Sequence, residues 1–170
     1  IMGREYALKS GEREDVAQAI YEHYLPRFAG DRLPVTEAGA LLALADKVDH
    51  LAGCFALGIR PTGSQDPYAL RRQSLGLLQI LLEHGFHLPL TELIRHALEL
   101  YRKRVTLQEM DLEELTAQIR DFILQRLRYL FQERGMDYDL VEAVLGSSLD
   151  EIAPLWNRVN FLQANRESEH

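Results

Sequence analysis

The chain has 170 residues, of which 46% are hydrophobic and 26% charged, so its composition excludes a disordered or collagen-like protein and fits one domain with a second begun. Its net charge of −7 excludes a bulk electrostatic attraction to nucleic acid, and no apolar run reaches the roughly 20 residues that a membrane-spanning helix needs. Cys54, the single cysteine, excludes an internal disulfide framework and a multi-cysteine zinc site, and it predicts a reducing, cytoplasmic compartment.

Apolar residues recur at helical spacing throughout the chain, which predicts an all-α fold. In chain order, we expect helices over residues 12–28, 36–58, 67–84, 91–104 and 111–135, followed by two short helices that open at Asp139 and Ser148. The segment 60–67 has no apolar period and is predicted to be an ordered loop.

Side chains that cap helices mark the predicted starts. Thr36 and Thr91 are expected N-caps, and Asp66 followed by Pro67 is a strong start signal. Three capping boxes follow, at Asp111 with Glu114, Asp139 with Glu142, and Ser148 with Glu151. The best internal boundary lies at 106–110, directly before the first of these boxes.

Candidate metal ligands occur on the first two predicted helices. His23, Asp46 and Asp49 would converge if these helices pack antiparallel, although two or three ligands do not close a site for a divalent ion. A histidine hydrogen-bonded to an aspartate within a structural polar cluster is the simpler interpretation, and we therefore predict no metal.

No catalytic nucleophile is recognisable. Cys54 lies in an apolar helical run, which favours a buried, inert thiol, and Ser64 lacks the glycine elbow and the strand that a hydrolase serine needs. We predict no catalytic residue in this chain.

Three arginines flank the polar loop. Arg60, Arg71 and Arg72 carry planar guanidinium groups that suit phosphate contacts. However, arginines at a helix N-terminus are opposed by the positive end of the helix dipole and need a carboxylate or phosphate partner. Asp66 is a possible internal partner, so a structural and a phosphate-binding interpretation both stay open.

Four sequence blocks in the first 72 residues have a familiar order. They read IMGREYA at 1–7, EHYLP at 22–26, LADKVD at 44–49 and PTGSQDPYALRR at 61–72. In this order they closely resemble the beta chain of bacterial glycine–tRNA ligase. Residues 122–130 and 139–145, with Arg158 following, look like the start of that chain's C-terminal helical anticodon-binding region.

This resemblance implies a two-chain aminoacyl-tRNA synthetase that makes glycyl-adenylate from glycine and ATP, with magnesium, in its alpha chain and then esterifies the tRNA. The beta chain of the family is much longer and supplies tRNA-binding modules. The resemblance therefore implies a non-catalytic piece of the enzyme whose partners are glycine tRNA, the alpha chain and the remainder of the beta chain, with no membrane. We expect phosphate contacts at Lys47, Arg60, Arg71 and Arg72, and an apolar surface, exposed by truncation, that permits a dimer.

A second, weaker resemblance connects the blocks AIYEH at 19–23, GDRLP at 30–34 and ADKVDHL at 45–51 to HD-type metal phosphohydrolases. The metal-ligand positions of those enzymes fall on His23 and Asp46, but their His-Asp pair has no counterpart here. The two resemblances together imply an HD-like helical domain at 1–106 and the truncated start of a helical anticodon-binding domain at 107–170.

Two alternatives to tRNA binding remain. One is a divalent-metal phosphohydrolase that uses His23, Asp46 and Asp49. The other is a module that mainly contacts other parts of its own synthetase.

Overall fold

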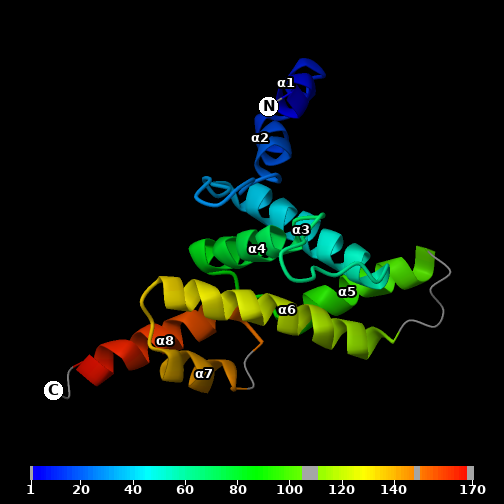
Figure 1. Cartoon of the computed structure of the whole chain (residues 1–170). Coiled ribbons are helices and arrows are strands. Elements are labelled where there is room, and N and C mark those ends of the chain that lie inside the picture. The colour runs from blue at the N-terminus through cyan, green and yellow to red at the C-terminus, as the bar shows by residue number, and fades with distance from the viewer. Residues whose placement is uncertain (1, 105–110, 148–149, 168–170) are drawn as a thin grey trace.

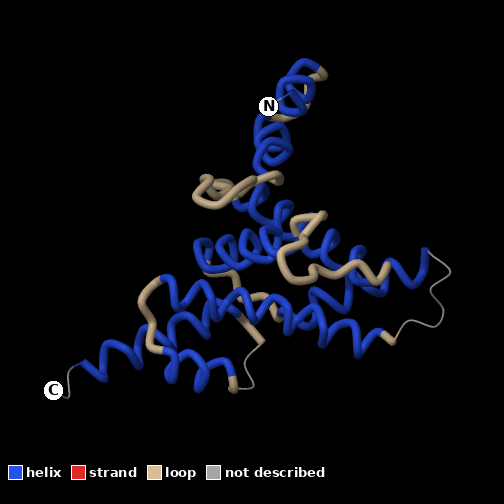
Figure 2. Tube along the Cα trace, viewed as in Figure 1, coloured by secondary structure: helices blue, strands red, loops and turns tan. Residues whose placement is uncertain are grey.

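The computed structural model describes residues 2–104, 111–147 and 150–167, and within these ranges it contains only helices and loops, which confirms the predicted all-α fold (Figures 1 and 2). The helices are α1 (Met2–Lys9), α2 (Glu14–Glu22), α3 (Glu37–Ala56), α4 (Leu70–His84), α5 (Leu90–Arg104), α6 (Leu112–Glu133), α7 (Tyr138–Leu145) and α8 (Ile152–Glu167).

The core lies between α3, α4, α5 and α6, with α7 and α8 packed at one end of α6 (Figure 1). Leu77 of α4, Leu98 of α5, Ile123 and Phe131 of α6 and Val159 of α8 are all fully buried. Burying a side chain of this size contributes roughly 1.5–3 kcal/mol to folding. A continuous core thus joins helices from both sides of the predicted 106/107 boundary, which itself lies outside the described residues.

Helices α1 and α2 project from this bundle (Figure 1). α1 packs on α2 and contains no buried residue, while Met2 and Tyr6 are largely exposed. The sequence pattern did not predict α1, because its few apolar residues form no continuous stripe.

Two predicted helix ends are wrong, for local reasons. α2 ends at Glu22 and not at Phe28, since Pro26 supplies no backbone N–H and restricts Leu25 before it. α4 begins at Leu70 and not at Pro67, because Ala69 adopts a left-handed conformation with a φ of 55° that interrupts the helix.

Some predicted caps form and others are replaced. Thr36 accepts a hydrogen bond from the Gly39 N–H at 3.0 Å, and Asp111 accepts from the backbone of α6, as predicted. Thr91 does not cap α5; its N–H and hydroxyl both donate to the carboxylate of Asp150, at 2.8 and 2.6 Å.

The capping box predicted at Asp139 with Glu142 does not form, and the box predicted at Ser148 with Glu151 includes a residue outside the described ranges. The residue preceding α7 is Asp137, and the two members of the predicted box bind elsewhere, Asp139 to Arg166 and Glu142 to Arg128. Ser148 lies outside the described residues, and α8 begins at Ile152.

Candidate functional site

The loop between α3 and α4 is ordered by its own backbone, as the sequence predicts. The N–H of Thr62 donates to the Gln65 carbonyl at 3.1 Å, and the N–H of Gln65 donates back to Thr62 at 2.8 Å. The guanidinium of Arg71 donates to the Gly63 carbonyl at 2.7 Å and ties the loop to the first turn of α4. The loop is therefore a fixed platform at the start of that helix.

Asp66 caps α4 and forms no ion pair with the neighbouring arginines of the described chain. Its two carboxylate oxygens accept from the backbone N–H groups of Leu70, at 2.8 Å, and Arg71, at 3.0 Å. Because this carboxylate serves the backbone, it leaves the side chains of Arg71 and Arg72 without a carboxylate partner within the described ranges. The structural interpretation therefore loses the predicted Asp66 partner but keeps the hydrogen bond from Arg71 to Gly63.

Three predicted phosphate ligands lie around this platform. Arg60 is exposed, and its guanidinium carbon stands 5.7 Å from the centre of the Phe55 ring. Arg71 is half-buried and Arg72 is exposed. The ring of Phe55, in the last turn of α3, packs edge-on against that of Phe122 on α6, at 5.5 Å between centroids, which connects the end of α3 to that helix.

Arg126 of α6 joins this group, and sequence reasoning missed it. Its guanidinium lies 4.8 Å from the centre of the Phe122 ring, and its buried Nε has no hydrogen-bond partner among the described residues. Burial first, and the charge of Arg71 second, hold the pKa of Arg126 below its usual value, while Asp66 partly offsets them. The sequence does carry a signal for Arg126, because it lies one helical turn from Phe122, on the partly buried face of α6.

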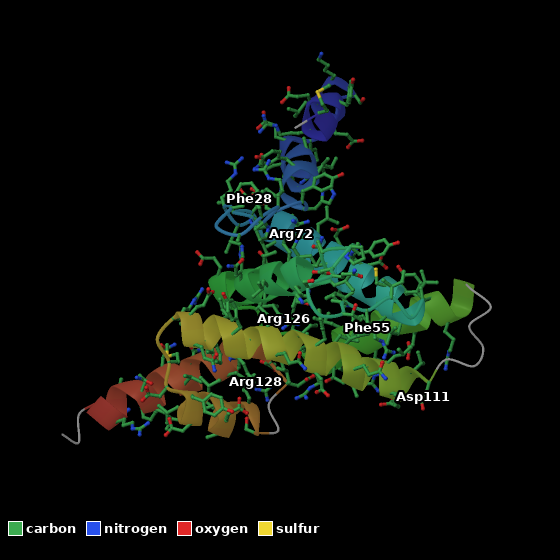
Figure 3. The ribbon with its side chains drawn as sticks, in the orientation of Figure 1. Phe28, Phe55, Arg72, Asp111, Arg126 and Arg128 are labelled. Atoms are coloured by element: carbon green, nitrogen blue, oxygen red, sulfur yellow. The ribbon has the colours of Figure 1, made fainter. Side chains whose placement is uncertain are left out.

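We call Arg60, Arg71, Arg72 and Arg126 the arginine surface. Figure 3 shows Arg72 on α4 and Arg126 on α6, two helices that pack together. Four guanidinium groups, with Asp66 engaged as a cap and Glu133 nearby accepting from Tyr129, make a local positive region on an acidic chain. Such a region favours a phosphate-bearing partner.

Lys47 does not lie on this surface. It is 1% exposed on the inner side of α3, and its Cε packs beside Gly76 of α4 and Pro26. Burial lowers the pKa of Lys47, and the nearby charge of Asp46 opposes that effect. The structure therefore gives Lys47 a packing role where the sequence predicted a phosphate contact.

The three candidate metal ligands, His23, Asp46 and Asp49, share one groove. They line an apolar groove of about 730 Å³ between α3 and α5, together with His96 and several leucines. Within the described residues, no group of three or more His, Cys, Asp or Glu side chains is arranged to hold an ion. Nδ1 of His23 lies 2.7 Å from the Ile20 carbonyl, and not against an aspartate as predicted. The phosphohydrolase alternative gains no support from this geometry.

Cys54 is buried in α3, and burial raises the pKa of its thiol. Both observations agree with the predicted inert thiol. None of the helices in the described part of the chain is both long and apolar enough to cross a membrane.

The sequence matches a family model described as "Glycyl-tRNA synthetase beta subunit" over residues 1–146. The glycine–tRNA ligase beta subunit of Desulforamulus reducens is 53% identical over 166 residues, which cover 98% of this chain and 24% of that protein. The corresponding subunit of Clostridioides difficile is 50% identical over 157 residues, or 92% of this chain and 22% of the relative. The chain thus spans about a quarter of the length of the curated relatives that it matches.

Proposed function

Because the chain belongs to the glycyl-tRNA synthetase beta-subunit family, we propose that it binds and positions glycine tRNA through the arginine surface. In this role the chain supplies recognition and the chemistry takes place elsewhere in the synthetase. Attachment of glycine with ATP and magnesium, in the alpha chain, is the activity that we propose for the whole assembly. Its partners are then the tRNA, the alpha chain and the remainder of the beta chain, in the cytoplasm.

The observation that carries this proposal is that Arg71 and Arg126, on the packed helices α4 and α6, bring like charges to one region of the surface. The charge of Arg71 adds to burial in lowering the pKa of Arg126, so the charged Arg126 side chain is costly unless an anion joins it. Asp66 is bound to backbone N–H groups and does not complete the neutralisation. A tRNA phosphate bound at the arginine surface would supply the missing negative charge.

Titration of the chain with glycine tRNA tests the proposal. We expect the Arg71→Ala/Arg72→Ala variant to bind at least tenfold more weakly at low salt, since each phosphate contact contributes roughly 1 kcal/mol or more. The matched control is Arg13→Ala/Arg95→Ala, which removes the same charge but from two arginines already paired with Asp15 and Glu92. The control is expected to bind like the wild type.

Equal binding by both double variants would contradict the proposal. If the arginine variant keeps its tRNA affinity but no longer assembles with the rest of the synthetase, the surface is an internal contact of the enzyme. The HD-like character of residues 1–106 and the anticodon-binding character of 107–170 stay predictions.

A further inference from the structure

We propose that the groove beside the arginine surface binds one unpaired RNA base, stacked on the ring of Phe28, with its phosphates held by Arg71 and Arg72. The inference rests on the proposed function, because it uses two of the same arginines. It goes further by naming the RNA element that the site recognises, a nucleotide outside a duplex, and by adding an aromatic residue that no charge pattern indicates.

The groove has a volume of about 630 Å³ and lies between α4, α6 and the loop that follows α2. Its walls include Phe28 and Gly30 from that loop, Arg71 and Arg72 from the first turn of α4, and Tyr129 from α6. Figure 3 shows Phe28 and Arg72 near each other at this end of α4. The size and the mixed lining are those of a site for a small planar group.

Phe28 is held in place although it is 56% exposed. The Arg27 guanidinium lies 5.7 Å from the centre of the Phe28 ring, and its Nε is 2.8 Å from the Asp31 carboxylate. That carboxylate also accepts from the Arg27 N–H at 2.9 Å and lowers the flexibility of the turn. An exposed aromatic ring on a turn fixed in this way is a ready stacking platform.

The remaining walls supply groups for the edge of a base. Tyr129 donates its hydroxyl to Glu133 at 2.5 Å, which leaves the second carboxylate oxygen of Glu133 to accept from an exocyclic amino group. Gln79 brings a donor and an acceptor to the same groove. Aromatic, polar and guanidinium groups in this combination are typical of sites that bind unpaired nucleotides.

A duplex would not use this groove, because a paired base has both faces covered by its neighbours. An unpaired base can leave the stack and place one face on Phe28, while the adjoining phosphates reach Arg71 and Arg72. The site therefore discriminates by base pairing and not by net charge.

The test uses a single-stranded RNA hexamer with 2-aminopurine at its centre, because the fluorescence of this base changes when it stacks. We expect Phe28→Leu to weaken hexamer binding roughly five- to tenfold and to abolish the fluorescence change, since loss of one aromatic stack has about this effect. The salt dependence of binding should stay that of the wild type, because no charge is removed. Phe161→Leu, at a 68% exposed phenylalanine of α8, is the matched control.

The outcomes separate this inference from the proposed function. If Arg71→Ala/Arg72→Ala weakens both tRNA and hexamer binding but Phe28→Leu binds like the wild type, base stacking is overturned and tRNA binding stands. A hairpin that carries the same base in a pair and binds as tightly as the hexamer would also overturn it. If Arg71→Ala/Arg72→Ala leaves tRNA binding intact, the result contradicts the proposed function, and the inference that rests on it falls as well. Because Phe28 is exposed, we expect Phe28→Leu to have the melting temperature of the wild type. This measurement shows that the variant folds.

Discussion

Arg71 of α4 and Arg126 of α6 lie on two helices that pack together, and the charge of Arg71 acts on Arg126 where Asp66 is already engaged by the backbone. Burial and this like charge lower the pKa of Arg126, and its Nε has no partner within the described chain. A side chain held in this way contributes little to folding, so its presence is better explained by a ligand than by stability.

We therefore expect Arg126→Met to weaken tRNA binding without destabilising the fold. Methionine keeps the apolar contact with Phe122 and removes a buried, unsatisfied donor, so the free energy of unfolding should stay constant or rise by up to about 1 kcal/mol. Urea denaturation and tRNA titration of the same variant measure the two effects.

Arg128→Met is the matched control on the same helix, labelled beside Arg126 in Figure 3. Nε of Arg128 donates to Glu142 of α7 at 2.6 Å. Its loss should lower the free energy of unfolding by about 1 kcal/mol and leave tRNA binding unchanged. If Arg126→Met lowers the free energy of unfolding and leaves tRNA binding unchanged, while Arg128→Met weakens tRNA binding, Arg126 is structural.

Glu22 is a buried carboxylate that organises the start of α3. It is 2% exposed and accepts from the Thr36 N–H at 3.0 Å, from the Thr36 hydroxyl at 2.5 Å and from the Gln18 amide at 2.7 Å. We expect Glu22→Gln to lower the free energy of unfolding by about 1–3 kcal/mol at pH 7, because the amide cannot accept all of these bonds.

The same carboxylate predicts a pH dependence. Burial raises the pKa of Glu22, but the hydrogen bonds from Thr36 and Gln18 outweigh burial, so its pKa lies below the ordinary 4.5. The stabilisation is present above 4.5 and is lost as the pH falls below that value. The free energy of unfolding of the wild type should decline as the pH falls below 4.5. Because Glu22→Gln lacks this carboxylate, the difference in free energy of unfolding between the two proteins should shrink over the same range. A difference in free energy of unfolding that stays constant as the pH falls below 4.5 would contradict this account of Glu22.

Gly39 permits the approach of α2 to α3. A Cβ at this position would lie 2.2 Å from Glu22 Oε2 and 2.7 Å from Glu22 Cβ. Alanine normally stabilises a helix by roughly 0.5–1 kcal/mol relative to glycine, so the sign of the effect is informative. We expect Gly39→Ala to destabilise the chain by about 2 kcal/mol or more, measured by urea denaturation. A stabilising Gly39→Ala would show that α2 does not pack as closely as described.

Asp150 connects the start of α5 to α6 and to the segment before α8. Besides both bonds from Thr91, it accepts from Nε of Arg120 at 3.3 Å. We expect Asp150→Ala to cost about 1–2 kcal/mol while thermal unfolding remains a single transition, because the helices share one core.

Asp139→Ala is the control for Asp150, since it removes an exposed ion pair with Arg166 and should cost less than about 0.5 kcal/mol. Two separate thermal transitions, of which Asp150→Ala shifts only one, would indicate independent domains on either side of residue 106.

Contacts between residues close in the sequence could be predicted from it. The caps at Thr36 and Asp111 could be predicted because each acceptor and its N–H donors lie within three residues of each other. Asp150 could not be assigned to α5, because it lies 59 residues from the Thr91 that it binds. The left-handed Ala69, which shifts the start of α4, also has no sequence signal, since alanine rarely adopts that conformation.

The candidate site was only partly predictable, for a related reason. Arg60, Arg71 and Arg72 stand close together in the sequence, whereas Arg126 joins them only through the packing of α6 on α4. Lys47 follows Leu44 by three residues and precedes Leu51 by four, so its helical position already indicated the buried face. The charge of Lys47 predicts a phosphate contact, but the structure buries this side chain.

The salt dependence of tRNA binding tests the arginine surface most directly. The slope of the logarithm of the association constant against the logarithm of salt concentration counts the phosphate contacts that release counterions. For Arg71→Ala/Arg72→Ala we predict a slope smaller in magnitude than that of the wild type by about 2, one unit for each lost contact. Wild-type and variant slopes that coincide would contradict the claim that these arginines bind tRNA phosphates.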